Sequence, residues 1–269
     1  LREELEKSGI DTIKADLLDS ATWNKLPKVK NVLYLAGTKF GTKGNEAFTW
    51  AMNTYLPSKV AEYYRDSRIV IFSTGNVYPL TEICQGGATE NTYPAPVGEY
   101  GQSCLGRERI FQYFSGKYQT PILIYRLNYA NDVKYGVLFE IACSVIEEKT
   151  IDLTMGNVNV IWQGDANEFA IRSLLHCATP YKILNVTGPE NLSVRWVAEW
   201  YGEYFKKKPV FSGEESRTAL LSNATESFKL FGYPRTSLKI MIEVIGNWIL
   251  NAGTTIKKPT HFQARDGNY

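Results

Sequence analysis

The chain of 269 residues lacks the patterns that mark membrane, secreted and nucleic-acid-binding proteins. No apolar run reaches the roughly 18 to 20 residues that cross a bilayer, and no basic, apolar and small-residue series of a secretion signal opens the chain. Lys and Arg total 30 while Asp and Glu total 28, a balance that gives no reason to expect a nucleic acid or an anionic membrane as partner. We therefore predict a cytoplasmic protein that binds neither.

Cysteine and histidine are scarce. The four cysteines lie far apart, form no CxxC pair and have no histidine pattern nearby: Cys84, Cys104, Cys143 and Cys177. His176 and His261 are each isolated, and a lone histidine is more often a packed or surface residue than a ligand. This scarcity predicts no metal site and no disulfide framework, and it leaves both histidines without an assigned role.

A glycine-rich strand-to-helix turn of the GxGxxG type is also missing, although such a turn ordinarily gives a pyrophosphate close approach to a helix N-terminus. The glycine-bearing stretch from Gly37 to Gly44 follows a predicted strand, but it matches neither GxGxxG nor a Walker A loop. The chain starts without Met, inside a predicted amphipathic helix from Leu1 to Ser8. We expect that a first βαβ unit is missing upstream.

What the sequence does contain is an alternation of short apolar runs with amphipathic segments of helical length. This alternation predicts parallel strands joined by crossover helices. The predicted strands cover residues 12–15, 31–37, 68–72, 121–127 and 182–186. The main predicted helices cover residues 45–64, 99–113, 135–148, 165–178, 193–205 and 237–250. Pro57 lacks a backbone N–H, so we expect a kink or two helices in the first of these.

The order of these elements predicts an α/β fold, a Rossmann-like doubly wound parallel sheet with a smaller, mainly helical C-terminal cap lobe. Residues 1–130 would form the dinucleotide-binding domain, N-terminally incomplete, and residues 131–269 the substrate-binding cap lobe. Residues 160–187 would return to the first domain. Residues 79–98 are rich in Pro, Gly, Thr and Glu and predict a long loop over an active site, and the polar tail from residue 253 could be loosely attached.

The most informative stretch, Phe72 to Tyr78, reads FSTGNVY, and it is followed about two dozen residues later by Tyr100 to Cys104, which reads YGQSC. Further motifs occur in a fixed order around it: Leu35-Ala36-Gly37, Asn53 in the next helix, Thr89-Glu90 and Arg126-Leu127-Asn128. Over most of its length the chain thereby resembles the extended short-chain dehydrogenases, the NAD-dependent epimerase/dehydratase family.

The resemblance implies an NAD(P)-dependent epimerase/dehydratase or oxidoreductase that acts on a sugar nucleotide or sugar-like polyol. Tyr100 would be the acid/base, Thr74 would hydrogen-bond the reacting oxygen, and Cys104 completes the candidate catalytic set. The residues implied to line NAD or NADP are Asp16, Leu17, Ala36, Gly37, Thr38, Asn53, Ser73 and Tyr100. Those implied to contact the substrate are Thr74, Asn76, Arg126 and Asn128. A homodimer paired through the helices that contain Asn53 and Tyr100 is also implied.

The chain departs from the family at Cys104. Removing a hydride from a secondary alcohol also requires loss of the hydroxyl proton. A phenol has a pKa of ~10, and this pKa must be lowered if the phenolate is to take that proton near neutrality. In the family, a lysine four residues after the tyrosine lies on the same helix face and favours the phenolate. Cys104 is neutral at its reference pKa of ~8.5 and too short to reach the cofactor's ribose.

Three interpretations stay open. In the first, another cation lowers the pKa of Tyr100, either the positive nicotinamide ring or one of the basic residues Lys39, Arg107 and Arg126. In the second, the site binds a nucleotide or sugar without turnover, as a sensor or scaffold. In the third, Cys104 is itself a nucleophile or acid/base group, but no histidine is near it in sequence, and buried cysteines usually act as small hydrophobes.

Overall fold

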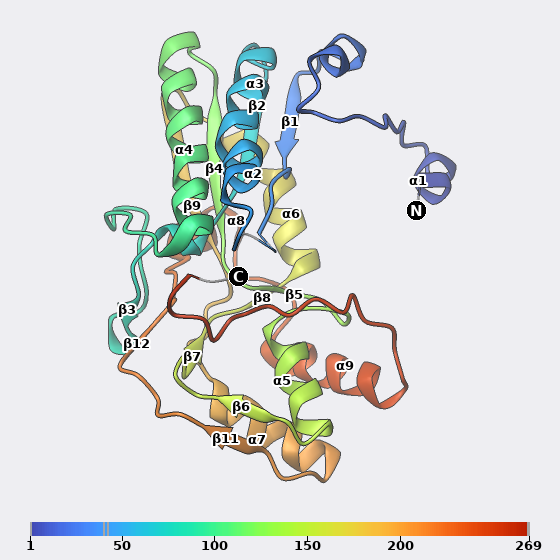
Figure 1. Cartoon of the computed structure of the whole chain (residues 1–269), viewed down its shortest axis with the longest axis vertical. Helices are drawn as coiled ribbons and strands as arrows, with labels where there is room; N and C mark the ends of the chain where they lie inside the picture. Colours follow the sequence, from blue (N-terminus) through green and yellow to red (C-terminus); the bar gives the residue numbers. More distant parts are fainter. Residues whose placement is uncertain (1, 40, 42, 268–269) are drawn as a thin grey trace.

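A four-stranded parallel sheet organises the upper half of the computed structural model, which describes residues 2–39, 41 and 43–267 (Figure 1). The strands follow the order β1 (Asn31–Tyr34), β2 (Arg68–Thr74), β4 (Ile122–Leu127) and β9 (Tyr181–Val186). Every pair is parallel, so that Ile71 of β2 lies between Tyr34 of β1 and Ile124 of β4. The predicted Rossmann-like α/β fold is confirmed.

Helices cover both faces of this sheet. On one face lie α3 (Leu56–Tyr63) and α4 (Gly98–Tyr118), and on the other lie α6 (Gln163–Ser173) and α8 (Thr225–Phe231). Successive residues of a strand point to opposite faces. Ile122 and Ile124 of β4 therefore join the core beneath α3 and α4, while Leu123 and Tyr125 join the core beneath α6 and α8. Burial on both faces explains why these strands read as continuous apolar runs.

The helix expected at residues 45–64 is divided, as its proline predicts. It consists of α2 (Glu46–Trp50), a π-helical segment η2 (Ala51–Tyr55) and α3. Pro57 lies in the first turn of α3, where its missing N–H is tolerated. The π segment contains Asn53, which is fully buried and faces the turn after β1.

The lower half of the molecule packs α5 (Val137–Ile146), α7 (Val194–Phe205) and α9 (Leu238–Leu250) around a second core (Figure 1). Ser193 caps α7 by accepting a hydrogen bond from the backbone N–H of Trp196. Short strand pairs flank the helices: β6 (Thr150–Asp152) with β11 (Val210–Ser212), β7 (Asn157–Val158) with β10 (Leu192–Ser193), β5 (Ala130–Asn131) with β8 (Ile161–Trp162), and β3 (Thr81–Glu82) with β12 (Thr218–Ala219).

The N-terminal residues differ from expectation. The helix α1 (Arg2–Lys7) buries none of its residues and lies apart from the sheet, and Leu1, where this helix was predicted to begin, is outside the described residues (Figure 1). Residues 12–15 form no strand, because β1 pairs only with β2 among the described residues and no partner supplies their backbone hydrogen bonds. A short 3₁₀ helix η1 (Ser20–Lys25) follows, capped by Asp19.

The C-terminal tail is docked rather than loose. It runs between the two halves of the molecule (Figure 1). Phe262 is buried in the second core, and Thr260 donates two hydrogen bonds of 2.6 Å to the carboxylate of Glu140 on α5. Arg265 donates to the carbonyl oxygen and the hydroxyl of Thr218. A tail fixed at three points can form part of a binding site.

No helix within the described residues combines the length and the apolar character needed to cross a membrane. The cytoplasmic location stays a prediction.

Candidate active site

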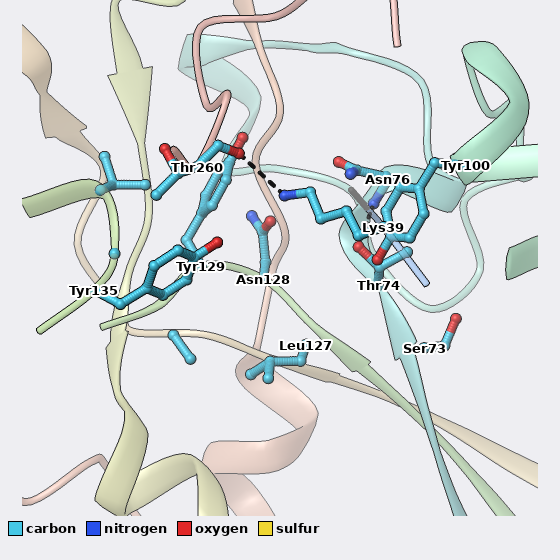
Figure 2. A pocket seen from close by; sticks show the side chains of 13 residues that line it. Lys39, Ser73, Thr74, Asn76, Tyr100, Leu127, Asn128, Tyr129, Tyr135 and Thr260 are labelled. Atoms are coloured by element: carbon cyan, nitrogen blue, oxygen red, sulfur yellow. Dashed lines mark hydrogen bonds between the residues drawn. The ribbon is translucent and has the colours of Figure 1, made fainter. Parts of the chain in front are cut away.

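A cavity of about 220 Å³ opens at the carboxyl ends of β2 and β4. This is the edge at which open α/β sheets bind their ligands. Figure 2 shows Lys39, Thr74 and Tyr100 on one side of the cavity and Tyr129, Tyr135 and Thr260 on the other. The other residues that line the cavity are Ser73, Asn76, Leu127, Asn128, Ala130, Gly136 and Val137. The site therefore lies between the sheet, the helical half and the tail.

The predicted pair of hydroxyls meets at this cavity. Thr74 ends β2, and its hydroxyl accepts a hydrogen bond from the backbone N–H of Asn76 in the 3₁₀ turn η3 (Gly75–Val77). Tyr100, in the first turn of α4, brings its phenol to a hydrogen bond with Thr74 (Figure 2). Gly101 permits this approach, since a Cβ there would lie 2.7 Å from the carbonyl oxygen of Asn76.

Burial disfavours the phenolate form of Tyr100. Burial raises its pKa well above 10, and the neighbouring Cys104 raises it further. The guanidinium of Arg107 and the hydrogen bond to Thr74 act in the opposite direction. Any role of Tyr100 as a base therefore needs a further source of positive charge.

Cys104 has no access to the cavity. Its side chain is fully buried and packs with Val77, Tyr78 and Ala88. Burial also raises the pKa of its thiol, so the nucleophilic thiolate is disfavoured. This placement gives no support to the interpretation in which Cys104 is the reactive group.

Lys39 lies beside Tyr100. It belongs to the loop after β1, and its ammonium nitrogen is 5.9 Å from the centroid of the Tyr100 ring. Its Nζ donates a 3.1 Å hydrogen bond to the carbonyl oxygen of Thr260 in the tail (Figure 2). Burial lowers the pKa of Lys39 to about 8, while Glu140 and Cys104 partly oppose that shift.

Three of the predicted cofactor residues come together at the turn after β1. Asn53 accepts from the backbone N–H of Thr38 at 2.9 Å and donates to the carbonyl oxygen of Thr38 at 2.8 Å. Arg107 donates to Asn53 at 2.7 Å and to the carbonyl oxygen of Phe72 at 2.7 Å. Gly37 is required here, because a Cβ would lie 2.3 Å from the Nη2 of Arg107. Asn53 thus fixes the turn from beneath and does not line the cavity.

The structure corrects the predicted substrate contact of Arg126. Its side chain is 1% exposed, and it donates to both carboxylate oxygens of Glu108 at 2.9 and 2.6 Å and to the phenol of Tyr78 at 2.6 Å. The alternation of strand side chains explains this placement, since position 126 of β4 points to the same face as Ile122 and Ile124, beneath α4.

The remaining predicted residues divide between the cavity and other places. Asn76 and Asn128 line the cavity, whereas the hydroxyl of Ser73, also at its edge, donates to Glu108. Asp16 is exposed and accepts from the backbone N–H of Leu18, outside the cavity. The apolar residues Leu17 and Ala36 pack against the core beneath α3 and α4.

Sequence reasoning missed the cavity wall that faces the sheet. Tyr129, Tyr135 and Thr260 belong to this wall, and none of them lies in a motif. Burial raises the pKa of Tyr135, and Glu140 adds to that shift. Tyr129, directly after Asn128, has a left-handed backbone with φ of 45°, which its residue type does not predict.

In the part of the chain that the structure describes, no group of three or more His, Cys, Asp or Glu side chains is placed to hold a metal ion.

The parallel sheet and the polar cavity at its carboxyl edge define a Rossmann-like α/β protein. Residues 2–134 match the model of the NAD dependent epimerase/dehydratase family. No curated protein matches the chain in sequence.

Solved structures with the same fold cover nearly the whole chain. MoeE5, in complex with UDP-glucose and NAD, is 16% identical with a TM-score of 0.75, and the match covers 93% of this chain and 94% of that one. UDP-glucuronic acid 4-epimerase from Bacillus cereus, in complex with UDP-glucuronic acid and NAD, is 16% identical with a TM-score of 0.76, over 93% and 86% of the two chains. RMD from Pseudomonas aeruginosa, complexed with NADPH, is 16% identical with a TM-score of 0.75, over 87% of each chain. At this identity the likeness shows a shared fold.

Proposed function

We propose that the protein is an NAD(P)-dependent enzyme of the epimerase/dehydratase or oxidoreductase type that acts on a sugar nucleotide. The observation that carries this proposal is the hydrogen-bonded pair of Thr74 and Tyr100 at the cavity on the carboxyl edge of the sheet. Structural relatives named as complexes with NAD and UDP-sugars support the cofactor and the substrate class. The NADPH complex of a third relative supports either form of the cofactor.

The residues at the turn after β1 fit the apolar ring and the ribose of a dinucleotide. Leu35 is 58% exposed and leaves apolar surface next to Gly37 at the carboxyl end of β1. The Nε of Arg107 is buried beneath this turn and has no hydrogen-bond acceptor among the described residues. Backbone groups at Gly37 and Thr38, together with the wall formed by Ser73, would hold the cofactor. When bound, NAD or NADP takes up a hydride from the substrate carbon and can return it.

The chain's own residues would handle the proton. In the oxidising direction, the phenolic oxygen of Tyr100 takes the proton of the substrate hydroxyl, and in the reducing direction it gives that proton back. Thr74 donates a hydrogen bond that fixes the same substrate oxygen. Asn128 is held by a 2.9 Å hydrogen bond to Asn159 and presents its amide to the cavity, where it would orient the sugar hydroxyls. Thr260 of the tail and Tyr135 line the opposite side of the cavity.

A second candidate function is a nucleotide- or sugar-binding protein without turnover. Two observations favour it: helix α4 carries Cys104 where the family carries a lysine, and burial raises the pKa of Tyr100. The binding surface would be the same in both cases. Turnover therefore separates the two functions.

Titration with NADH and NADPH, followed by intrinsic and nicotinamide fluorescence, is expected to show saturable binding of at least one of them. UDP-hexoses, UDP-hexuronic acids and free sugars should then be tested for a change in absorbance at the reduced nicotinamide band and for epimer formation by NMR. Turnover of a UDP-sugar is the expected result. Tight cofactor binding without any product would favour the non-catalytic function, and absence of cofactor binding would contradict the proposed enzyme.

We further propose that residues 1–130, with residues 160–187, form the cofactor-binding part and that the rest of residues 131–269 forms the substrate-binding lobe. The pairing of β9 with β4 and the packing of α6 on the sheet support the inclusion of residues 160–187 in the first part.

A homodimer is the expected assembly, with the faces of α2, η2 and α4 in contact with those of a second copy. These elements expose large apolar side chains, with Phe48 46%, Tyr55 54% and Tyr113 61% exposed. We expect that light scattering after size exclusion gives twice the chain mass of 30.4 kDa. Tyr55→Glu combined with Tyr113→Glu is expected to give monomers, because charges are depleted at the centre of interfaces. Tyr233→Glu, at a 70% exposed site elsewhere, is the control. A wild-type monomer would contradict this assembly.

A further inference from the structure

The loop after β1 brings a cation to the place where helix α4 lacks one. The stem of Lys39 runs beside the ring of Tyr100, and its Nζ lies 5.9 Å from the ring centroid (Figure 2). Lys39 is also the one Lys, Arg, Asp or Glu side chain in the described lining of the cavity. Opposite charges within ~4–6 Å favour the ionised form of a titrating group.

The other two candidate cations, Arg126 and Arg107, bind groups outside the cavity. Arg126 is paired with Glu108 in the core beneath α4. Arg107 lowers the pKa of Tyr100, but its guanidinium donates to Asn53 and to the carbonyl oxygen of Phe72, and it does not line the cavity. Lys39 is the cation that shares the cavity with the phenol.

We propose that Lys39 replaces the lysine missing from helix α4, so that its ammonium group stabilises the phenolate of Tyr100 during proton transfer. This inference rests on the proposed function and adds a positioning residue to it. Lys39 acts through Tyr100. A positive charge held beside the phenol lets Tyr100 take the substrate proton although position 104 is neutral.

The C-terminal tail orients this lysine. The carbonyl oxygen of Thr260 accepts from the Nζ of Lys39 at 3.1 Å, and Thr260 is itself held by two 2.6 Å hydrogen bonds to Glu140 of α5. Three segments distant in sequence therefore set the position of one ammonium group. Residues of the helical half and of the tail therefore position a group that assists proton transfer at Tyr100.

The titratable groups around Lys39 define the expected pH dependence. They are Tyr100 and Cys104 on α4 with Arg107 behind them, Glu140 on α5, Tyr129 and Tyr135 across the cavity, and His261 next to Thr260 in the tail. On this proposal, Lys39 and Tyr100 titrate as a coupled pair. The active form of the pair, a Tyr100 phenolate beside a Lys39 ammonium group, has one proton fewer than the fully protonated pair. The pKa of Lys39, about 8, places that loss near pH 8. We therefore expect the rate of substrate oxidation to rise with pH through this region.

Steady-state kinetics of Lys39→Met provide the first test. We expect kcat to fall about 100-fold at neutral pH with KM within 3-fold of wild type, because the lost charge acts on the phenol. The rising limb of the pH profile should move up by about one pH unit or more. Lys39→Arg should recover part of the rate, and Lys43→Met, which removes an exposed lysine of the same loop, should match wild type. A raised KM with unchanged kcat would overturn the proposal and make Lys39 a contact of the substrate.

A second test needs neither turnover nor cofactor. A trifluorotyrosine at position 100 has a lower intrinsic pKa, so its fluorine NMR titration falls where Lys39 still carries its charge. We expect a higher midpoint in Lys39→Met than in the parent protein. An unchanged midpoint would overturn the inference even if the enzyme is active, whereas an inactive enzyme with the expected shift would contradict only the proposed function.

Discussion

Tyr100→Phe is expected to lower kcat for UDP-sugar turnover by about 10³-fold while cofactor affinity stays within 3-fold. The substitution removes only the phenolic oxygen, which is the group that meets Thr74 at the cavity. The aromatic ring keeps its packing against Val77 and Tyr78, so the loss is confined to proton transfer and to the position of the reacting oxygen. The expected pattern is a fall in kcat with KM nearly unchanged.

Measurement of kcat, KM and NADH affinity on the same preparation separates this loss from misfolding. Tyr113→Phe is the matched control, since Tyr113 lies on the same helix, is 61% exposed and is outside the cavity. It should retain wild-type kinetics. If Tyr100→Phe keeps its rate, the acid/base role passes to another group and the mechanism proposed above fails.

The sheet could be predicted from sequence because its strands are buried on both faces. Continuous apolar runs bounded by turn residues identify β2 and β4 with little ambiguity, and the length of the intervening segments requires helical crossovers. The strand expected at residues 12–15 has the right residue types, but residue type cannot supply a hydrogen-bonding neighbour. Propensity predicts strands best where tertiary pairing also exists.

The site could be predicted in part. Thr74, Asn76 and Tyr100 were found because they follow a strand or open a helix at the carboxyl edge, and strand order brings such residues together. The contact of Lys39 with Thr260, across 221 positions, has no local signal. Arg126, a charged residue at the end of a strand, was predicted to contact the substrate. That prediction failed because its buried partner, Glu108 of α4, is distant in sequence.

Glu108→Gln is expected to lower the free energy of unfolding by about 3–5 kcal/mol, because it breaks the buried ion pair with Arg126. Glu108 and Arg126 are 0% and 1% exposed and form two hydrogen bonds to each other. Substitution of the carboxylate leaves the guanidinium buried without a counterion, and removing one partner of such a pair costs more than removing both. Urea denaturation should show a lower midpoint with an unchanged slope.

A double-mutant cycle with Arg126→Met gives the sharper result. The double variant, which leaves no unpaired charge, is expected to lose much less stability than the sum of the two single losses. Glu226→Gln is the control. The side chains of Glu226 and Lys229 are 51% and 65% exposed, and their ion pair should contribute less than about 1 kcal/mol to stability. Additive losses in the cycle would mean that the two groups do not act as a pair. Since Glu108 lies on α4, which also carries Tyr100 to the cavity, the Glu108→Gln protein should also lose kcat at temperatures at which it remains folded.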